Sequence, residues 1–487
     1  MQNQTILQSF EWYTTDDGSF YRTMKDMVPS FSLLGLTAVW LPPACKAQNG
    51  IQDTGYGIYD LYDLGEFEQK GSVRTKYGTR QEYLELIQAL HDHGLEVYCD
   101  VVLNQKMGAD ETEDVMVVDS ASNNRNHDSS SQHMIKAWTK FTFPGRNGKY
   151  SDFIWDHTCF DGTDYDAGTG RSAVYRFTGK AWDSAVDSEN GNYDYLMGCD
   201  LDMNNPMVKD ELLKWGKWYY DTTHFDGLRL DAVKHISSDF YGWWLHEMRN
   251  YTGKDFFAVG EYWNGDLARL HDYLKRSLLC MSLFDVPLHY KFYNAASCNG
   301  QCDMRKLFDD TLVGTMPEHA VTFVDNHDTQ PTQALSSFVQ AWFKPIAYAI
   351  ILLMEKGIPC VFAGDLYGIP HDGIQPVKEL PLFMRLRKDY AYGKETWYRE
   401  QKDVIGFTRA GDDEHQDTAL CIVLSDGPGG SIRMDAGKQF AGKQFADVLD
   451  HCHEIVMVQE DGTALFRCEG GSVSVWMEQE AAQRMGK

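Results

Sequence analysis

The chain of 487 residues contains no apolar run of about 18 or more residues, which a membrane-spanning helix requires. Its beginning, Met1–Phe10, has no basic segment and no long apolar run, so we expect no signal peptide. Internal repeats and low-complexity tracts are absent as well. Since 43% of the residues are hydrophobic, the chain can bury a large core, and its length predicts two or three domains.

Cysteine pairs of the CxxC type are also absent. The 11 Cys are scattered, and several of them, such as Cys99, Cys360 and Cys421, lie inside apolar segments. Zinc and redox motifs use closely spaced Cys, so this pattern argues against both. We interpret the Cys as buried free thiols of a cytoplasmic protein, because disulfide frameworks belong to oxidising compartments.

Positive charge is scarce, and the formal net charge is -26. Nucleic acids and anionic membranes are bound through basic surfaces, so we expect neither as a partner. The negative charge suits a neutral substrate and favours solubility. Part of it is available to bind cations, and the chain is expected to act as a monomer.

Short apolar segments alternate with helical patterns from the N-terminus to about residue 395. Eight segments are expected to be strands: Ile6–Phe10, Thr37–Leu41, Leu95–Val102, Phe225–Leu230, Phe256–Val259, Met281–Val286, Val321–Val324 and Ile358–Phe362. Helix start signals lie between them, at Thr79-x-x-Glu82, Asn205-Pro206 and Lys344-Pro345. Alternation of strands and helices predicts a parallel sheet, and eight repeats predict a closed (β/α)8 barrel of the TIM type.

Two regions depart from the alternation. Residues 104–205 are rich in Asp, Asn, Ser, Gly and Tyr and are too long for a simple loop, so we expect an inserted, irregular, β-rich domain after the third strand. Short strands separated by Gly-rich turns predict a C-terminal antiparallel β-sandwich over residues 396–487. The barrel would then consist of residues 1–103 and 206–395.

Acidic residues follow several of the predicted strands. Arg229 and Asp231 are two residues apart on one strand and so face the same side, into the barrel mouth. We expect the Arg229 charge to keep Asp231 ionised as a nucleophile. Glu261 ends the next strand, where neighbouring carboxylates would raise its pKa as a proton donor requires. With Asp328 as a third carboxylate, the set matches the chemistry of glycoside hydrolysis.

These segments together resemble the signature regions of the α-amylase family of glycoside hydrolases (family 13), and most of all its bacterial liquefying-type and cytoplasmic members. Gly55–Phe67 and Tyr195–Asn204 carry further parts of the likeness, which extends over essentially the whole chain. The resemblance implies that Asp231 is the nucleophile, Glu261 the acid/base and Asp328 the carboxylate that holds sugar hydroxyls. It implies substrate contacts for Arg229, His327, Tyr56, Trp263, Lys234, His235 and Gln105.

The same resemblance implies calcium in the inserted domain, where acidic side chains supply the oxygen ligands that this ion prefers. A central ion would be held by Asn104, Asp194, Asp200 and the carbonyl of His235. A second metal cluster would use Asp161, Asp183, Asp202 and the carbonyl of Ala181. Asn204 stands where the family has Asp, so this cluster has one charge fewer than the family pattern.

Gln105 is a second departure, since the family has a sugar-contacting His after this Asn. Gln donates and accepts hydrogen bonds but cannot become cationic, which puts substrate preference or rate in question. The reaction class is unaffected because all three carboxylates are present.

The expected activity is endo-hydrolysis of α-1,4-glucosidic bonds in starch, glycogen or maltodextrins with retention of configuration. Two alternatives stay open at this point. A 4-α-glucanotransferase would differ only in whether a sugar or water intercepts the covalent intermediate. A non-catalytic glucan-binding member of the family would be expected to have lost a carboxylate, and this chain has lost none.

Overall fold

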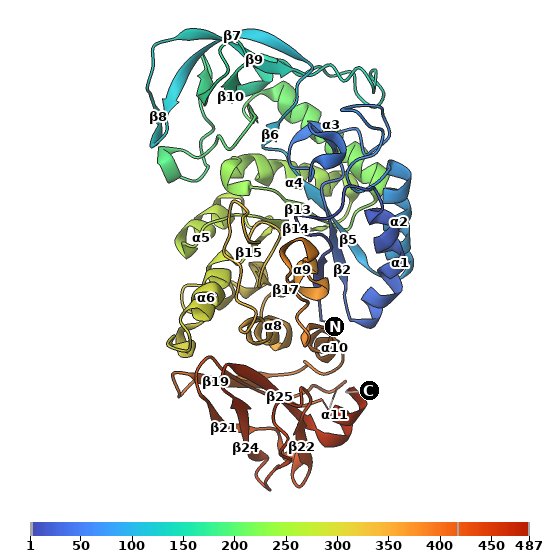
Figure 1. Cartoon of the computed structure of the whole chain (residues 1–487), viewed down its shortest axis with the longest axis vertical. Coiled ribbons are helices and arrows are strands. Elements are labelled where there is room, and N and C mark those ends of the chain that lie inside the picture. The colour runs from blue at the N-terminus through green and yellow to red at the C-terminus, as the bar shows by residue number, and fades with distance from the viewer. Residues whose placement is uncertain (1–2, 416–417, 486–487) are drawn as a thin grey trace.

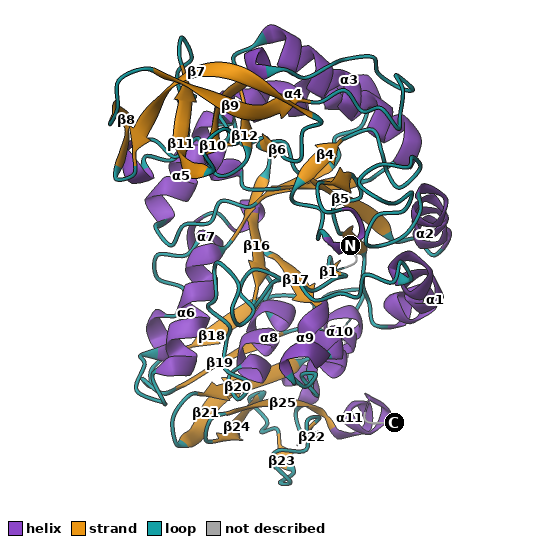
Figure 2. Cartoon of the chain, turned by 45° about the horizontal axis from the view of Figure 1, so that its top comes forward, coloured by secondary structure: helices purple, strands orange, loops and turns teal. Residues whose placement is uncertain are grey.

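The computed structural model describes residues 3–415 and 418–485. Residues 1–2 and 486–487, which bound the predicted barrel and C-terminal domains, lie outside this part. A closed parallel barrel forms the centre, in the order β1-β17-β16-β15-β14-β13-β5-β2 (Figures 1 and 2). Its strands are β1 (Ile6–Gln8), β2 (Ala38–Leu41), β5 (Glu96–Val101), β13 (Gly227–Leu230), β14 (Phe257–Gly260), β15 (Ser282–Phe284), β16 (Ala320–Phe323) and β17 (Ile358–Phe362). All eight predicted barrel strands are confirmed.

Helices surround the barrel and connect its strands (Figure 2). They are α1 (Phe20–Leu33), α2 (Arg80–Asp92), α3 (Pro206–Thr223), α4 (Ser238–Thr252), α5 (Leu267–Arg276), α6 (Val286–Ser297), α7 (Leu312–Thr315), α8 (Lys344–Leu353), α9 (Ala363–Tyr367) and α10 (Leu380–Asp389). The predicted capping box at Thr79 and Glu82 is present at the start of α2. Asn205 caps α3 by accepting a hydrogen bond from the Met207 backbone N–H. These caps satisfy amide groups that a helix start leaves unpaired.

The inserted region lies at one end of the molecule, above the barrel in Figure 1. It contains β6 (Gln105–Lys106), β7 (Glu111–Ala121), β8 (Asn124–Asp128), β9 (His133–Lys140), β10 (Phe160–Asp166), β11 (Arg171–Phe177) and β12 (Cys199–Leu201), which form one sheet. The predicted β-rich character is therefore confirmed, and the strands pair more regularly than the irregular region we expected. Buried and exposed residues alternate along β9, and this period of two allows a polar segment to form a regular half-buried strand.

The C-terminal region lies at the opposite end and is antiparallel, as predicted (Figure 1). One sheet has the order β18-β19-β20-β25-β22-β23, and β21 pairs with β24. The strands are β18 (Glu395–Tyr398), β19 (Val404–Arg409), β20 (Leu420–Ser425), β21 (Gly429–Asp435), β22 (Gln444–Asp447), β23 (Val456–Met457), β24 (Thr463–Glu469) and β25 (Ser472–Glu478), and the short helix α11 (Gln479–Met485) follows. The sequence pattern predicts five of these strands, at Val404–Phe407, Ala419–Leu424, Glu454–Val458, Ala464–Arg467 and Val473–Trp476. The strands β18, β21 and β22 were not predicted, because their apolar residues are too few to give a pattern.

The cysteines agree with the sequence analysis except at one pair. Nine are free, and eight of these are buried. Cys298 and Cys302 form a disulfide at the end of α6, so the prediction of free thiols only is wrong there. Among the described residues, no helix is long and apolar enough to cross a membrane.

Candidate functional site

Arg229 is the centre of the acidic site at the carboxyl ends of the barrel strands. Its guanidinium is fully buried. Arg229 Nη1 donates to Asp231 Oδ1 at 2.6 Å, and Nη2 donates to Glu261 Oε2 at 2.6 Å. Nη1 also donates to Asp100 Oδ1 at 3.0 Å, because Asp100 is the register partner of Arg229 on the neighbouring β5. One guanidinium therefore connects three carboxyl groups from three adjacent strands.

Burial has the largest effect on the pKa of Asp231. Loss of solvent raises the pKa of Asp231 well above its ordinary value, and the charges of Glu261, Asp100 and Asp328 add to this, against the opposing effect of Arg229. Arg229 acts in the opposite direction and favours the ionised form of Asp231, so the prediction that Arg229 keeps Asp231 ionised as a nucleophile stays a prediction. Environments that separate the pKa values of neighbouring acids are what paired acid and nucleophile roles require.

His327 and Asp328 reach the site from the loop after β16. His327 is buried, its Nδ1 lies 2.9 Å from Gln8 Nε2, and its Nε2 lies 3.4 Å from Asp328 Oδ2. Burial lowers the pKa of His327 to about 3 and raises the pKa of Asp328 to about 6. The imidazole is thus neutral near pH 7, and it can give a hydrogen bond without adding charge.

A buried ion pair fixes the loop that carries these two residues. Lys344 Nζ lies 2.9 Å from Asp325 Oδ2, and Asp325 Oδ1 accepts a hydrogen bond from the Thr329 hydroxyl at 2.8 Å. Asn326 Oδ1 accepts from the backbone N–H of Asp328 at 2.9 Å. The position of Asp328 is therefore set by hydrogen bonds on both sides of it in the chain.

A pocket of about 380 Å³ opens above the carboxyl groups. Its lining includes all three predicted catalytic acids and most of the predicted substrate residues: Asp231, Glu261, Asp328, Tyr56, Gln105, Lys234, His235 and Trp263. The remaining two, Arg229 and His327, are buried beside these acids. The predicted catalytic and substrate-binding residues therefore come together in one place, although they lie up to 272 positions apart in the chain, from Tyr56 to Asp328.

Tyr56 occupies the wall of the pocket, in the loop between β3 (Lys46–Ala47) and β4 (Ile58–Asp60). Its hydroxyl donates to Asp100 Oδ2 at 3.0 Å, which fixes the ring. The ring is nearly parallel to that of His327, at a centroid distance of 5.2 Å, and to that of Trp12, at 6.4 Å. Tyr56 therefore presents a fixed, partly exposed aromatic side chain to the pocket.

The remaining predicted residues have backbone or side-chain partners. His235 Nδ1 lies 2.7 Å from the carbonyl of Tyr193, and burial lowers the pKa of His235 to about 3. Lys234 Nζ donates to the carbonyl of Trp263 at 3.2 Å. Trp263 Nε1 donates to the Tyr290 hydroxyl at 3.0 Å.

Asp100 and Trp12 are among the residues of the site that were not predicted. Asp100, near the end of β5, received no predicted role; its register position beside Arg229 identifies its part in the site. Trp12 lines the pocket from the loop after β1, and its backbone N–H donates to Gln330 Oε1 at 2.8 Å. Nothing in the local sequence distinguishes this Trp from a core residue.

The inserted region brings a group of acidic side chains together. Carboxylate oxygens of Asp161, Asp183 and Asp202 lie within 4.8 Å of one another. Asp161 Oδ2 and Asp183 Oδ2 are buried and have no hydrogen-bond partner among the described residues. Asn204 Nδ2 donates to Asp183, and Lys180 donates to Asp202. Unpaired carboxylate oxygens at this spacing suit a hard cation with oxygen ligands. Ala181 precedes Asp183 by two residues in the same loop and is itself exposed.

The other predicted metal residues lie beside this cluster. Asn104 Nδ2 is 3.4 Å from Asp200 Oδ1, while Asp200 Oδ2 is buried and unpaired. Asp194 Oδ2 accepts from the backbone N–H of Asp183 at 2.7 Å, so Asp194 connects the two groups. Burial and the charges of the neighbouring acids raise the pKa of Asp200 well above its ordinary value. A cation bound here would relieve that repulsion.

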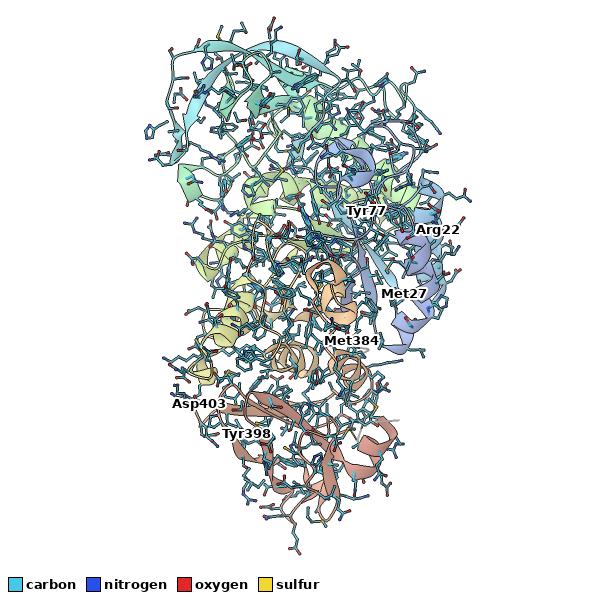
Figure 3. The ribbon with its side chains drawn as sticks, viewed as in Figure 1. Arg22, Met27, Tyr77, Met384, Tyr398 and Asp403 are labelled. Carbon is cyan, nitrogen blue, oxygen red and sulfur yellow. A yellow bond between two sulfur atoms is a disulfide. The ribbon has the colours of Figure 1, made fainter. Side chains whose placement is uncertain are left out.

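A further acidic pair, not predicted from the sequence, lies where the C-terminal region meets the barrel. Asp403 is at the barrel-facing edge of this region (Figure 3). Asp403 Oδ1 and both carboxylate oxygens of Asp426 are buried with no hydrogen-bond partner among the described residues. Burial raises the pKa of Asp426 to about 6. These oxygens are also of the type that hard cations bind.

The acidic cluster predicts how stability depends on pH after chelator treatment. Burial, reinforced by like charges, raises the pKa of Asp161 to about 9, of Asp183 to about 8 and of Asp194 to about 7. The unfolded chain releases these protons near pH 4. Because the folded chain then holds more protons between about pH 4 and pH 9, its free energy of unfolding should fall as pH rises through this range. Thermal melting in chelator at pH 5, 7 and 8.5 measures this; a Tm that rises toward pH 8.5 would contradict it.

Comparisons with known proteins identify a family and several relatives of this chain. The family described as "Alpha amylase, catalytic domain" matches residues 26–410. An alpha-amylase of Geobacillus stearothermophilus is 52% identical over 98% of this chain and 87% of its own length. The cytoplasmic alpha-amylase of Escherichia coli (strain K12) is 40% identical over 99% of this chain and 100% of its own length.

A third relative, the glucan 1,4-alpha-maltohexaosidase of Bacillus sp. (strain 707), is 47% identical over 98% of this chain and 92% of its own length. Among solved structures, an alpha-amylase of Geobacillus thermoleovorans in complex with acarbose has a TM-score of 0.64 at 20% identity. It covers 98% of this chain and 97% of its own, and it supports the fold. The family match and the identities over nearly the full length lead to one conclusion: the chain belongs to the alpha-amylase family of glycoside hydrolases.

Proposed function

We propose that this chain hydrolyses internal α-1,4-glucosidic bonds in starch, glycogen or maltodextrins and retains the configuration of the anomeric carbon. The observation that carries the proposal is the single Arg229 guanidinium that binds both Asp231 and Glu261 at 2.6 Å. It keeps the two carboxyl groups close together in one pocket. Retaining glycosidases hold their two carboxyl groups roughly 5–5.5 Å apart, whereas inverting enzymes need room for a water between them.

The proposed mechanism has two steps. Asp231 attacks the anomeric carbon while Glu261 gives its proton to the leaving glycosidic oxygen, which forms a covalent glycosyl-Asp231 ester and releases the shortened glucan. Glu261 then takes a proton from water, the water oxygen attacks the same carbon, and the bond to Asp231 breaks. Asp328 and the neutral His327 would hold hydroxyl groups of the reacting sugar, and Tyr56 would pack against its ring.

A polymeric substrate is supported by a second hollow beside the pocket. This hollow has a volume of about 340 Å³ and is lined in part by Lys106 and Gly198, whose chain neighbours Gln105 and Met197 line the pocket. Trp138, on β9, lines it with 44% of its surface exposed. Exposed aromatic rings beside polar groups offer an apolar face of the kind that packs against a sugar. The two hollows together suit a chain of several glucose units.

We further propose that calcium is the bound ion, held by Asn104, Asp194, Asp200 and the His235 carbonyl, with a second metal at Asp161, Asp183 and Asp202. The unpaired oxygens of Asp161, Asp183 and Asp200 support this assignment. A cytoplasmic location is proposed from the buried free thiols and from the name of the Escherichia coli relative. We expect the chain to act as a monomer.

Incubation of the purified chain with a single maltooligosaccharide tests the proposed reaction. Products shorter than the substrate, and none longer, are expected. Longer products would show that a sugar intercepts the intermediate, as in a 4-α-glucanotransferase. An unchanged substrate that still binds would identify a glucan-binding protein. Asp231→Asn, which keeps the size of the side chain but cannot act as nucleophile, should lose at least about 10⁴-fold of kcat and serves as the control for contaminating activity.

The configuration of the first product tests the roles of the two carboxyl groups. Because two displacements occur at the same carbon, the fresh product should be the α-anomer. Proton NMR during the first minutes, before mutarotation, measures it directly. Initial release of the β-anomer would show that Asp231 activates water instead of forming an ester.

Calcium should stabilise the chain, because a ligand that binds only the folded state raises its free energy of unfolding. At a free concentration about 100 times Kd, the expected gain is about 2.7 kcal/mol. Thermal melting with calcium and with a chelator measures it. Asp200→Asn should weaken the response, whereas Asp461→Asn, on an exposed turn of the C-terminal region, should not. Equal Tm values with calcium and chelator in the parent chain would contradict the assignment.

A further inference from the structure

Gln105 occupies an unusual position between the pocket and the inserted region. It lies on β6, whose register partner across β12 is Asp200, and its side chain lines the pocket with the three carboxyl groups. Only 2% of Gln105 is exposed. A polar side chain this deeply buried is expected to have a partner for each of its polar atoms.

One end of the Gln105 amide is already paired. Gln105 Nε2 donates to the backbone carbonyl of Tyr56 at 3.0 Å. A carbonyl can only accept, so this contact determines which end of the amide is nitrogen and which is oxygen. The other end is therefore Oε1, an acceptor.

Gln105 Oε1 is buried and has no hydrogen-bond partner among the described residues. Leaving a buried acceptor unpaired is unfavourable, so a bound ligand that supplies a donor gains from meeting it. The nearby acids of the pocket, Asp231, Glu261 and Asp328, accept hydrogen bonds whenever they are ionised. The ligand that fits this set is rich in hydroxyl groups.

We infer that Gln105 is a specificity-determining residue that accepts a hydrogen bond from one hydroxyl group of the glucan. This inference rests on the proposed function and adds a direction to the contact: the sugar donates and the protein accepts. A substrate whose hydroxyl at that position is replaced by hydrogen or by fluorine cannot donate, and is discriminated against.

A panel of maltooligosaccharides with single deoxy or deoxyfluoro substitutions tests the direction in the unmodified chain. At one hydroxyl position, both replacements should lower kcat/KM by roughly 10- to 100-fold relative to the parent sugar. If, at every affected position, the fluoro sugar keeps the kcat/KM of the parent sugar and only the deoxy sugar loses it, then the protein donates the hydrogen bond. That result would overturn the inference. Cleavage of the unmodified sugar is measured first, so failure of the proposed function is recognised separately.

The Gln105→Met variant tests whether Gln105 is the residue that contacts the sugar hydroxyl identified with the panel. Met has a similar unbranched shape and lacks the hydrogen-bonding amide. The variant also loses the bond to Tyr56, which lowers kcat/KM for all substrates together. The ratio of kcat/KM for the modified sugar to kcat/KM for the parent sugar isolates the sugar contact. At the position identified above, this ratio should return to within about threefold of one, while the ratios at other positions stay unchanged. Unchanged ratios at every position would overturn the inference.

A crystal structure of the Glu261→Gln variant with the unmodified sugar gives a test that does not need a Gln105 variant to fold. A sugar hydroxyl oxygen is expected within about 3.2 Å of Gln105 Oε1, with Nε2 still bonded to the Tyr56 carbonyl. A bound sugar with no oxygen near Oε1, or an amide turned toward the sugar through Nε2, would overturn the inference.

Discussion

The charge-assisted hydrogen bonds of Arg229 are the interaction on which the site depends. A buried cation is tolerated only when it is paired, and Arg229 is paired with Asp231, Glu261 and Asp100. The barrel makes this possible because β13 has β5 on one side and β14 on the other, so one guanidinium reaches acids on both neighbours. Removing the guanidinium would leave several buried carboxyl groups without a counter-ion, and they would then take up protons or separate.

Neutralisation of buried carboxylates also connects the inserted region to the pocket. β6 follows β5 after a short connection and pairs with β12, which brings Gln105 beside Asp200. Gln105 lines the pocket, and Asp200 belongs to the acidic cluster of the inserted region. A cation that neutralises Asp194 and Asp200 would therefore also hold the strand that presents Gln105. Stability of the inserted sheet and geometry of the sugar contact are coupled through these two short strands.

The sequence predicted the parts of this structure that follow from local patterns. Apolar runs located all eight barrel strands, and the two-residue spacing of Arg229 and Asp231 placed both on one face. The β-rich character of the insertion was predicted, but the regular pairing of its strands and the role of Asp100 were not, because both come from pairing between distant segments. No local sequence pattern around Trp12 indicated that it lines the pocket.

The roles of Asp231 and Glu261 can be separated by restoring activity to Ala variants with azide, a small nucleophile. In Glu261→Ala, azide should attack the glycosyl-Asp231 ester in place of the base-assisted water and give the α-glycosyl azide. In Asp231→Ala, azide should occupy the space of the lost carboxylate and give the β-glycosyl azide. Product NMR distinguishes the two. A β-azide from Glu261→Ala, or an α-azide from Asp231→Ala, would contradict the arrangement of acids around Arg229 that this account describes.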